Sequence, residues 1–190
     1  YKINGNDNLG GIVGYLEGTM KNCYSIGEIN GGNNVGGIAG FVSNTGLINT
    51  SYTKGDLNGI HNVGGIAGIS EGTIENTYSY CNINGNVNVG GIVGLSFGNI
   101  SKTLSLGLIT GVSNIGGIVG AIHSGHLDIG FALNYSVDAS IGSVNRISGS
   151  NLGSIGYAYS WDSMMVNGIK ITGGQLDSES GLGFYSGKIF

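Results

Sequence analysis

Histidines and carboxylates are the side chains of this sequence that most readily suggest chemistry. Two of the three histidines, His123 and His126, lie three residues apart and could be interpreted as a metal-binding pair. Zinc sites take three or four protein ligands, and no third ligand or H-E-x-x-H motif accompanies these two. We therefore expect both histidines to lie in a solvated turn, and we expect no metal and no cofactor.

The eleven acidic residues do not form the pair on one face that hydrolytic catalysis needs. Glu71 and Glu75, in the third of the repeats described below, lie close together in sequence, and solvated strand positions explain both. Asp7 and Asp56 lie near turns, but no aspartate recurs from repeat to repeat as it does in calcium-binding β-rolls. The sequence therefore predicts a protein that is not an enzyme.

Composition and charge exclude several classes of partner. The 190 residues include 40 glycines and no proline, and only seven lysines and arginines, which are scattered singly in a chain of net charge −4. Nucleic acids and anionic membranes both require clustered cations. No apolar stretch approaches the roughly 18 residues of a membrane-spanning helix. We therefore expect no nucleic-acid partner and no insertion into a membrane. Because β-forming and turn-forming residues dominate, we expect a chain of short strands.

The elements that position the side chains are set by an internal repeat. Gly-Gly pairs begin at residues 10, 36, 64, 90 and 116, and a degenerate sixth copy at 144–149 follows the fifth by 29 residues. Each copy holds three short extended segments between Gly or Asn turns, which is one coil of a β-solenoid. We predict an all-β, single-stranded β-solenoid (β-helix) of about six coils of 26–29 residues, stacked about 4.8 Å apart.

Aligned repeats place identical residue types in columns along the axis. One column is the predicted core ladder: Ile12, Ile38, Ile66, Ile92, Ile118 and Ile147. We expect the glycine and asparagine columns at turns that need positive φ, which both residues tolerate. The asparagine column would either form a stacked amide ladder or face water as separate turn residues: Asn8, Asn34, Asn62, Asn88 and Asn114.

An aromatic-rich column is the candidate ligand-binding site: Tyr24, Tyr52, Tyr78, Phe131 and Tyr159. Alternation along the strand groups these residues with Lys54, Glu28 and Asp56, which predicts that they face outward. An exposed stripe of this kind could stack on sugar rings or dock a partner. The alternative is a bend between Asn22 and Ser25 that turns the rings into the core. We favour the bend, because corners of solenoids often break the alternation.

The two cysteines, Cys23 and Cys81, lie in coils one and three of this alignment. Their axial separation is then about 9.6 Å, whereas a disulfide needs Cα atoms within about 7 Å. We therefore expect no disulfide. Cys23 shares its column with Ser51 and other small residues, and Cys81 replaces a turn glycine.

These motifs resemble the GLUG repeat, which is named after a G-L/I-x-G signature seen here at residues 11–14 and in the later copies. The N-T-Y-S continuation at 76–79 and the stretch 131–168 resemble the same family, so the resemblance covers residues 1 to about 170. It implies parallel, right-handed winding and a location at the bacterial cell surface or outside the cell. Some members are immunoglobulin A1 zinc metallopeptidases in which the repeats lie outside the protease domain. The family has no agreed catalytic residues to transfer.

Residues 1–160 are expected to form the coils and 161–190 a degenerate last coil and C-terminal cap. The first coil is interpreted as truncated, because residues 3–5 match residues 29–31 at the end of a later coil. We expect a non-enzymatic spacer or adhesion module of a larger protein, with a host glycan or matrix protein and the parent's other domains as partners. The alternative is a substrate-positioning segment of a secreted metallopeptidase whose catalytic domain lies outside this fragment.

Overall fold

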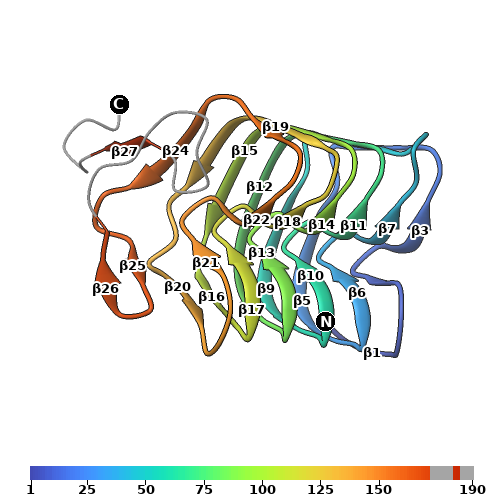
Figure 1. Cartoon of the computed structure of the whole chain (residues 1–190). Coiled ribbons are helices and arrows are strands. Elements are labelled where there is room, and N and C mark those ends of the chain that lie inside the picture. The colour runs from blue at the N-terminus through green and yellow to red at the C-terminus, as the bar shows by residue number, and fades with distance from the viewer. Residues whose placement is uncertain (172–181, 185–190) are drawn as a thin grey trace.

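The computed structural model describes residues 1–171 and the strand at 182–184, and every element in these residues is a β-strand. Figure 1 shows the coils stacked side by side from the N-terminal to the C-terminal end. Strands of successive coils pair in parallel, which confirms the predicted all-β solenoid of about six coils. Among the described residues, no helix has the length and apolar character needed to span a membrane. The handedness stays a prediction.

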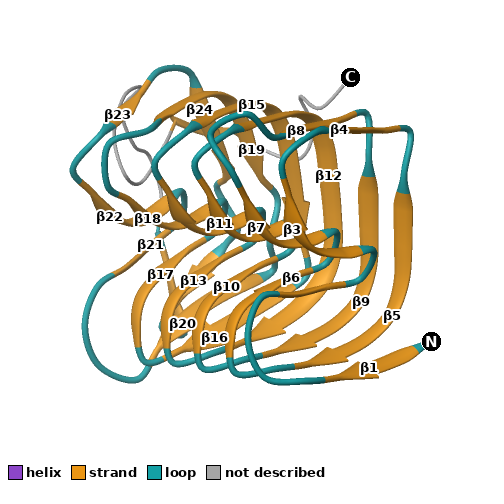
Figure 2. Cartoon of the chain, turned by 90° about the vertical axis from the view of Figure 1, so that its right-hand side faces the viewer, coloured by secondary structure: helices purple, strands orange, loops and turns teal. Residues whose placement is uncertain are grey.

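Each coil contributes strands to three sheets, which form the sides seen from the N-terminal end in Figure 2. Sheet B consists of β2 (Leu9–Gly10), β6 (Asn33–Gly36), β10 (His61–Gly64), β13 (Val87–Gly90), β17 (Ser113–Gly116) and β21 (Val144–Asn145). Sheet C consists of β3 (Val13–Leu16), β7 (Ala39–Val42), β11 (Ala67–Ser70), β14 (Val93–Ser96), β18 (Val119–Ile122) and β22 (Ser148–Asn151).

Sheet A is the largest of the three and has 15 strands among the described residues. They are β1 (Lys2–Asn4), β4 (Thr19–Lys21), β5 (Tyr24–Asn30), β8 (Leu47–Asn49), β9 (Tyr52–Asn58), β12 (Thr73–Asn84), β15 (Asn99–Leu106), β16 (Leu108–Gly111), β19 (His126–Ala132), β20 (Ser136–Ala139), β23 (Ser154–Ile155), β24 (Ala158–Trp161), β25 (Met165–Val166), β26 (Ile169–Lys170) and β27 (Leu182–Phe184). In the third coil the side formed by this sheet is one strand of 12 residues, β12.

The Gly-Gly pairs join sheets B and C, and their role differs from the one predicted. Neither glycine of a pair adopts positive φ. A Cβ atom on Gly36 would instead lie 2.0 Å from the carbonyl oxygen of Ala39, and one on Gly37 would lie 2.2 Å from that of Gly65. These glycines are therefore required because neighbouring backbone approaches too closely for any side chain.

Isoleucines follow the glycine pairs and line the interior. Five of the six in the predicted core ladder are fully buried: Ile38, Ile66, Ile92, Ile118 and Ile147. Their backbones are bonded from coil to coil, as in the 2.9 Å bond from Ile38 N to Ile66 O. Ile12 departs from the prediction, with 45% of its surface exposed. It lies in the first coil, which packs against a neighbouring coil on one side only.

The described part of the predicted cap continues the stack and then reverses. Strand β25 pairs in parallel with β20, and β26 then pairs antiparallel with β25. Strand β27 pairs in parallel with β24. The rest of the predicted cap, residues 172–181 and 185–190, lies outside the described residues.

Candidate functional site

The outer face of sheet A is set by a left-handed residue in each of the first five coils. In the third coil Asn76 has a φ of 53°, and both Ile74, two residues before it, and Thr77, directly after it, are buried. From Thr77 to Asn84 buried and exposed residues then alternate strictly. The bend therefore lies ahead of the aromatic column and shifts the alternation by one residue, so that Tyr78 points outward.

The aromatic column consequently lies outside the core. Tyr24 is 62% exposed and Tyr78 is 40% exposed, so the favoured prediction that a bend turns these rings inward is wrong. A bend does occur at Asn22, with a φ of 58°, but it has the opposite effect. The remaining members, Tyr52, Phe131 and Tyr159, are half-buried, and stacked rings cover both faces of Tyr52 and one face of each of the other two.

The rings of this column stack on one another. Tyr24 and Tyr52 have centroids 5.3 Å apart and Tyr52 and Tyr78 4.9 Å apart, with planes within 10° of parallel. Phe131 and Tyr159 form a second stack at 5.1 Å. Tyr52 therefore has a ring on each of its faces, and it offers a ligand its edge and hydroxyl group. Stacking of sugar rings along the whole column, as the sequence suggested, does not fit this arrangement.

Tyr80, which the sequence analysis did not select, has an unstacked ring. It lies two residues after Tyr78 on β12, pairs with Lys54 of the preceding coil, and is 53% exposed. A hollow of about 250 Å³ lies beside it, lined also by Tyr52 and Thr53. The signal that identifies Tyr80 is its spacing of two residues from an outward-facing aromatic, which places both on one face of the strand.

The next two outward columns of the same strands are polar. They line a groove of about 490 Å³ whose walls include Asp56, Asn58, Asn82 and Asn84. The amide of Asn82 donates a hydrogen bond of 3.0 Å to Asp56 Oδ1. The groove therefore lies directly beside the aromatic half of this face, and it is lined by carboxamide and carboxylate groups.

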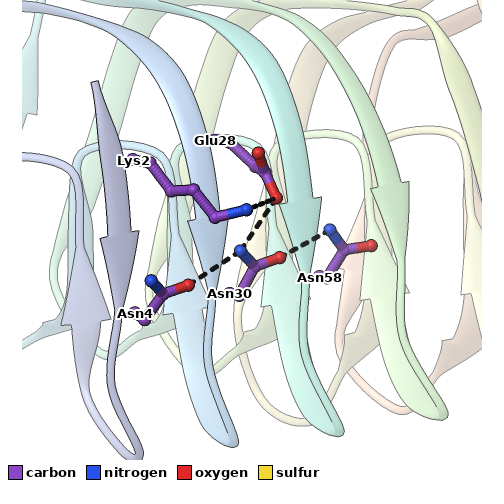
Figure 3. Close-up of polar contacts among 5 residues, drawn as sticks. All are labelled: Lys2, Asn4, Glu28, Asn30 and Asn58. Atoms are coloured by element: carbon purple, nitrogen blue, oxygen red, sulfur yellow. Dashed lines mark hydrogen bonds and ion pairs between the residues drawn. The ribbon is translucent and has the colours of Figure 1, made fainter.

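At its N-terminal end this polar surface is held by a connected network, shown in Figure 3. Lys2 Nζ lies 2.9 Å from Glu28 Oε1, and Asn30 Nδ2 donates to the same oxygen at 2.9 Å. The hydrogen bond from Lys2 and then that from Asn30 lower the pKa of Glu28. Asn30 also donates to Asn4, and Asn58 donates to Asn30. These side chains are thereby fixed in position before any ligand arrives.

The asparagine column at the start of sheet B forms a continuous amide ladder. Each Nδ2 donates to the Oδ1 of the preceding coil at 2.8 to 2.9 Å, from Asn114 through to Asn8. All five residues have φ between 50° and 58°. Of the two alternatives left open by the sequence, the stacked ladder is the one observed, and the same residues also supply the left-handed turn.

The remaining candidate residues lie apart from the aromatic column and the polar groove. The prediction that both histidines lie in a turn is correct for His123 only, because His126 is exposed at the start of β19. His126 Nδ1 is 2.8 Å from Ser154 Oγ, and the His123 ring lies 5.0 Å from that of Phe97. Within residues 1–171, no three histidine, cysteine or acidic side chains gather in a way that could hold a metal ion. Cys23 and Cys81 are both free, and burial raises the pKa of the Cys81 thiol.

Parallel sheets wound around one core define a β-solenoid repeat protein. The family model described as the GLUG motif matches residues 5–30, which confirms the resemblance to the GLUG-repeat family. The matched residues span one coil, and its strands pair in register with those of the second coil in all three sheets. Searches of curated proteins and of solved structures found no match.

Proposed function

We propose that this chain is a non-enzymatic structural and adhesion module of a larger bacterial surface or secreted protein. It acts as a stiff rod that presents the outer face of sheet A to a host glycan or matrix protein. The surface or secreted location is what the GLUG resemblance implies. The alternative remains a substrate-positioning segment of a secreted metallopeptidase, for which the same face would hold the substrate.

Stiffness is supported by the bonding along the axis. Backbone hydrogen bonds join every coil to the next in three sheets, and the asparagine ladder adds side-chain bonds in the same direction. Bending the rod would stretch these bonds on one side or compress them on the other. Such a module keeps whatever it carries at a fixed distance.

The observation that carries the binding role is the division of the outer face of sheet A into two halves. An aromatic half with the exposed ring of Tyr80 lies beside the polar groove at Asn82 and Asn84. Exposed apolar side chains bordered by polar groups are typical of interaction surfaces. Hydrogen bonds already hold the carboxylates Glu28 and Asp56, which supports a binding rather than a catalytic role.

The test is a binding screen of the purified chain against immobilised glycans and matrix proteins, with Tyr80→Ala as the site variant. Tyr15→Ala is the matched control, because Tyr15 is 52% exposed, against 53% for Tyr80, but lies on sheet C. We expect saturable binding that Tyr80→Ala weakens and Tyr15→Ala does not. Equal binding by wild type and the Tyr80→Ala variant would contradict the assignment of the site to sheet A.

A further inference from the structure

We infer that the polar groove on the outer face of sheet A binds a neutral glycan chain lying along the solenoid axis. Sugar hydroxyl groups bridge the side chains of Asn58 and Asn84 in the bound state. This inference rests on the proposed function, and it names the chemical class of the ligand and the atoms that recognise it.

An interrupted amide row marks the place where a ligand belongs. Asn4, Asn30 and Asn58 are joined by hydrogen bonds of 3.0 and 2.9 Å. Asn84 is the next member, since its Cα pairs with that of Asn58. In the part of the chain that the structure describes, however, no hydrogen bond joins these two amides. The asparagine ladder of sheet B, in contrast, runs without a break from Asn8 to Asn114.

Neighbouring bonds fix which atoms are left at the break. Asn58 donates one N–H of Nδ2 to Asn30, and among the described residues its Oδ1 accepts no hydrogen bond. Asn84 Oδ1 accepts from Thr110 Oγ1 at 3.1 Å, and among the same residues its Nδ2 donates none. Both residues line the groove. The break therefore presents one acceptor and one donor, one coil apart, to the same space.

A hydroxyl group fits this pair because it can donate and accept at once. It would accept from Asn84 Nδ2 and donate to Asn58 Oδ1, which completes the row. Carboxylates or ammonium groups satisfy only one of the two positions. Sugars carry many hydroxyl groups on a rigid ring, so the chemistry of the break favours a carbohydrate.

The charges on this face favour a ligand without net charge. From Lys2 to Thr110, the charged side chains in the four outward columns are two lysines and two carboxylates. Lys2 is paired with Glu28 at 2.9 Å, and Lys54 lies two residues from Asp56 on β9. Their charges cancel, so neither a sulfated glycan nor a polycation gains long-range attraction here.

The adjoining apolar half complements the less polar faces of sugar rings. Tyr80 offers an unstacked ring face next to its hollow, one outward column from Asn82 on β12. An extended peptide finds less to bind, because the backbone groups of β9 and β12 are already paired within the sheet and offer no free edge. A carbohydrate uses both the ring and the amides.

The groove also determines the direction and the length of the ligand. Its lining runs from Glu28 to Thr110, which belong to four successive coils. Three steps between coils correspond to about 14 Å along the axis. A chain of several sugars fills this length, whereas a monosaccharide reaches only one step. Affinity should therefore rise steeply from a monosaccharide to an oligosaccharide.

The test titrates the whole chain with neutral oligosaccharides of increasing length, and with sulfated and uronic-acid oligosaccharides, by calorimetry or NMR. Asn84→Asp removes the donor at the break and keeps the acceptor for Thr110, and we expect it to weaken neutral-glycan binding about tenfold. Asn44→Asp, in the exposed turn between β7 and β8, adds the same charge elsewhere and should change nothing. Neutral-glycan affinity should differ less than about twofold between low and high salt.

Two results would overturn the inference, and they separate it from the proposed function. Binding restricted to anionic glycans and weakened by salt would exclude a neutral ligand. Binding of a matrix protein that depends on Tyr80 but survives enzymatic removal of its glycans would also overturn the inference, although the adhesion role would stand. If neither glycans nor matrix proteins bind the wild-type chain, both proposals fail.

Discussion

At the scale of single residues, the asparagines of sheet B show how one side chain can meet two demands. Each takes a left-handed backbone conformation, and the three inner ones, Asn34, Asn62 and Asn88, bond to the amide of the coil before and of the coil after. Glycine would satisfy the first demand but not the second, and glutamine the second but not the first. Asparagine satisfies both at once, which explains its recurrence in the first five coils.

Asn62 separates these two contributions experimentally. Asn62→Gly keeps the φ of 55° but loses two hydrogen bonds of 2.8 Å, and we expect a loss of about 1 to 2 kcal/mol in the free energy of unfolding. Asn62→Ala adds the strain of a left-handed non-glycine residue and should lose about 1 kcal/mol more. Urea titration of the wild type and the two variants measures the loss of the hydrogen bonds and the added backbone strain. Equal stability of the two variants would show that the left-handed conformation imposes no cost.

At the scale of elements, the sequence predicted some features of the coil well and others poorly. The period and the buried isoleucines followed from a regular pattern, because close packing leaves little choice at those positions. The left-handed bend in sheet A did not, because its column holds Asn22, Thr50, Asn76, Lys102 and Ile129. With no shared residue type, this column does not mark the shift, and only the alternation with Lys54, Glu28 and Asp56 further along the strand indicated that the tyrosines face outward.

The site was predictable only in part for a related reason. Repetition made the aromatic column visible, but the stacking that covers its ring faces is a property of neighbouring coils in space. Tyr80 was overlooked because its column changes from Ile26 to Lys54 to Tyr80. The break between Asn58 and Asn84 cannot be seen in the sequence at all, since both positions carry the same residue.

The glycines of the coil provide a matched pair of substitutions. A Cβ on Gly65 would lie 2.1 Å from Gly91 O and 2.1 Å from Ser79 Oγ. Gly65→Ala should therefore lower the free energy of unfolding by about 3 kcal/mol or more. Gly18 has no atom within 4 Å of its added Cβ and no positive φ, so Gly18→Ala should be neutral or stabilise by up to about 1 kcal/mol.

Thermal unfolding followed by circular dichroism measures both changes. The Gly18→Ala variant also serves as the control for the general effect of adding a methyl group. A Gly65→Ala variant as stable as the wild type would mean that the coils can move apart at this turn, and that the close approach does not explain the Gly-Gly pairs.

At the scale of the whole molecule, the sixth coil differs from the other five. It holds Arg146 in the column that is glycine in each of them. The guanidinium lies 3.6 Å from Asp162, with both side chains almost fully buried, and it donates to the carbonyl of Ile171 at 3.2 Å. Burial lowers the pKa of Arg146, and the attraction of Asp162 opposes that change.

This ion pair should hold the last coil in place. Arg146→Ala leaves Asp162 buried without its partner, and we expect a loss of about 3 kcal/mol or more in the free energy of unfolding. The double variant Arg146→Met, Asp162→Leu removes both charges and fills their space, so it should recover a large part of that loss. Denaturant unfolding of both variants tests this. A double variant no more stable than Arg146→Ala would indicate that the unpaired charge of Asp162 does not cause the loss in the single variant.

The direction of the asparagine ladder gives the rod an electrical polarity. Every amide donates toward the N-terminal end and accepts from the C-terminal side, from Asn114 to Asn8, and the row at Asn4, Asn30 and Asn58 runs the same way. Aligned dipoles add, as peptide dipoles do along an α-helix. The side-chain amides therefore contribute a positive N-terminal pole and a negative C-terminal pole. Two such rods placed end to end would attract head to tail and repel head to head.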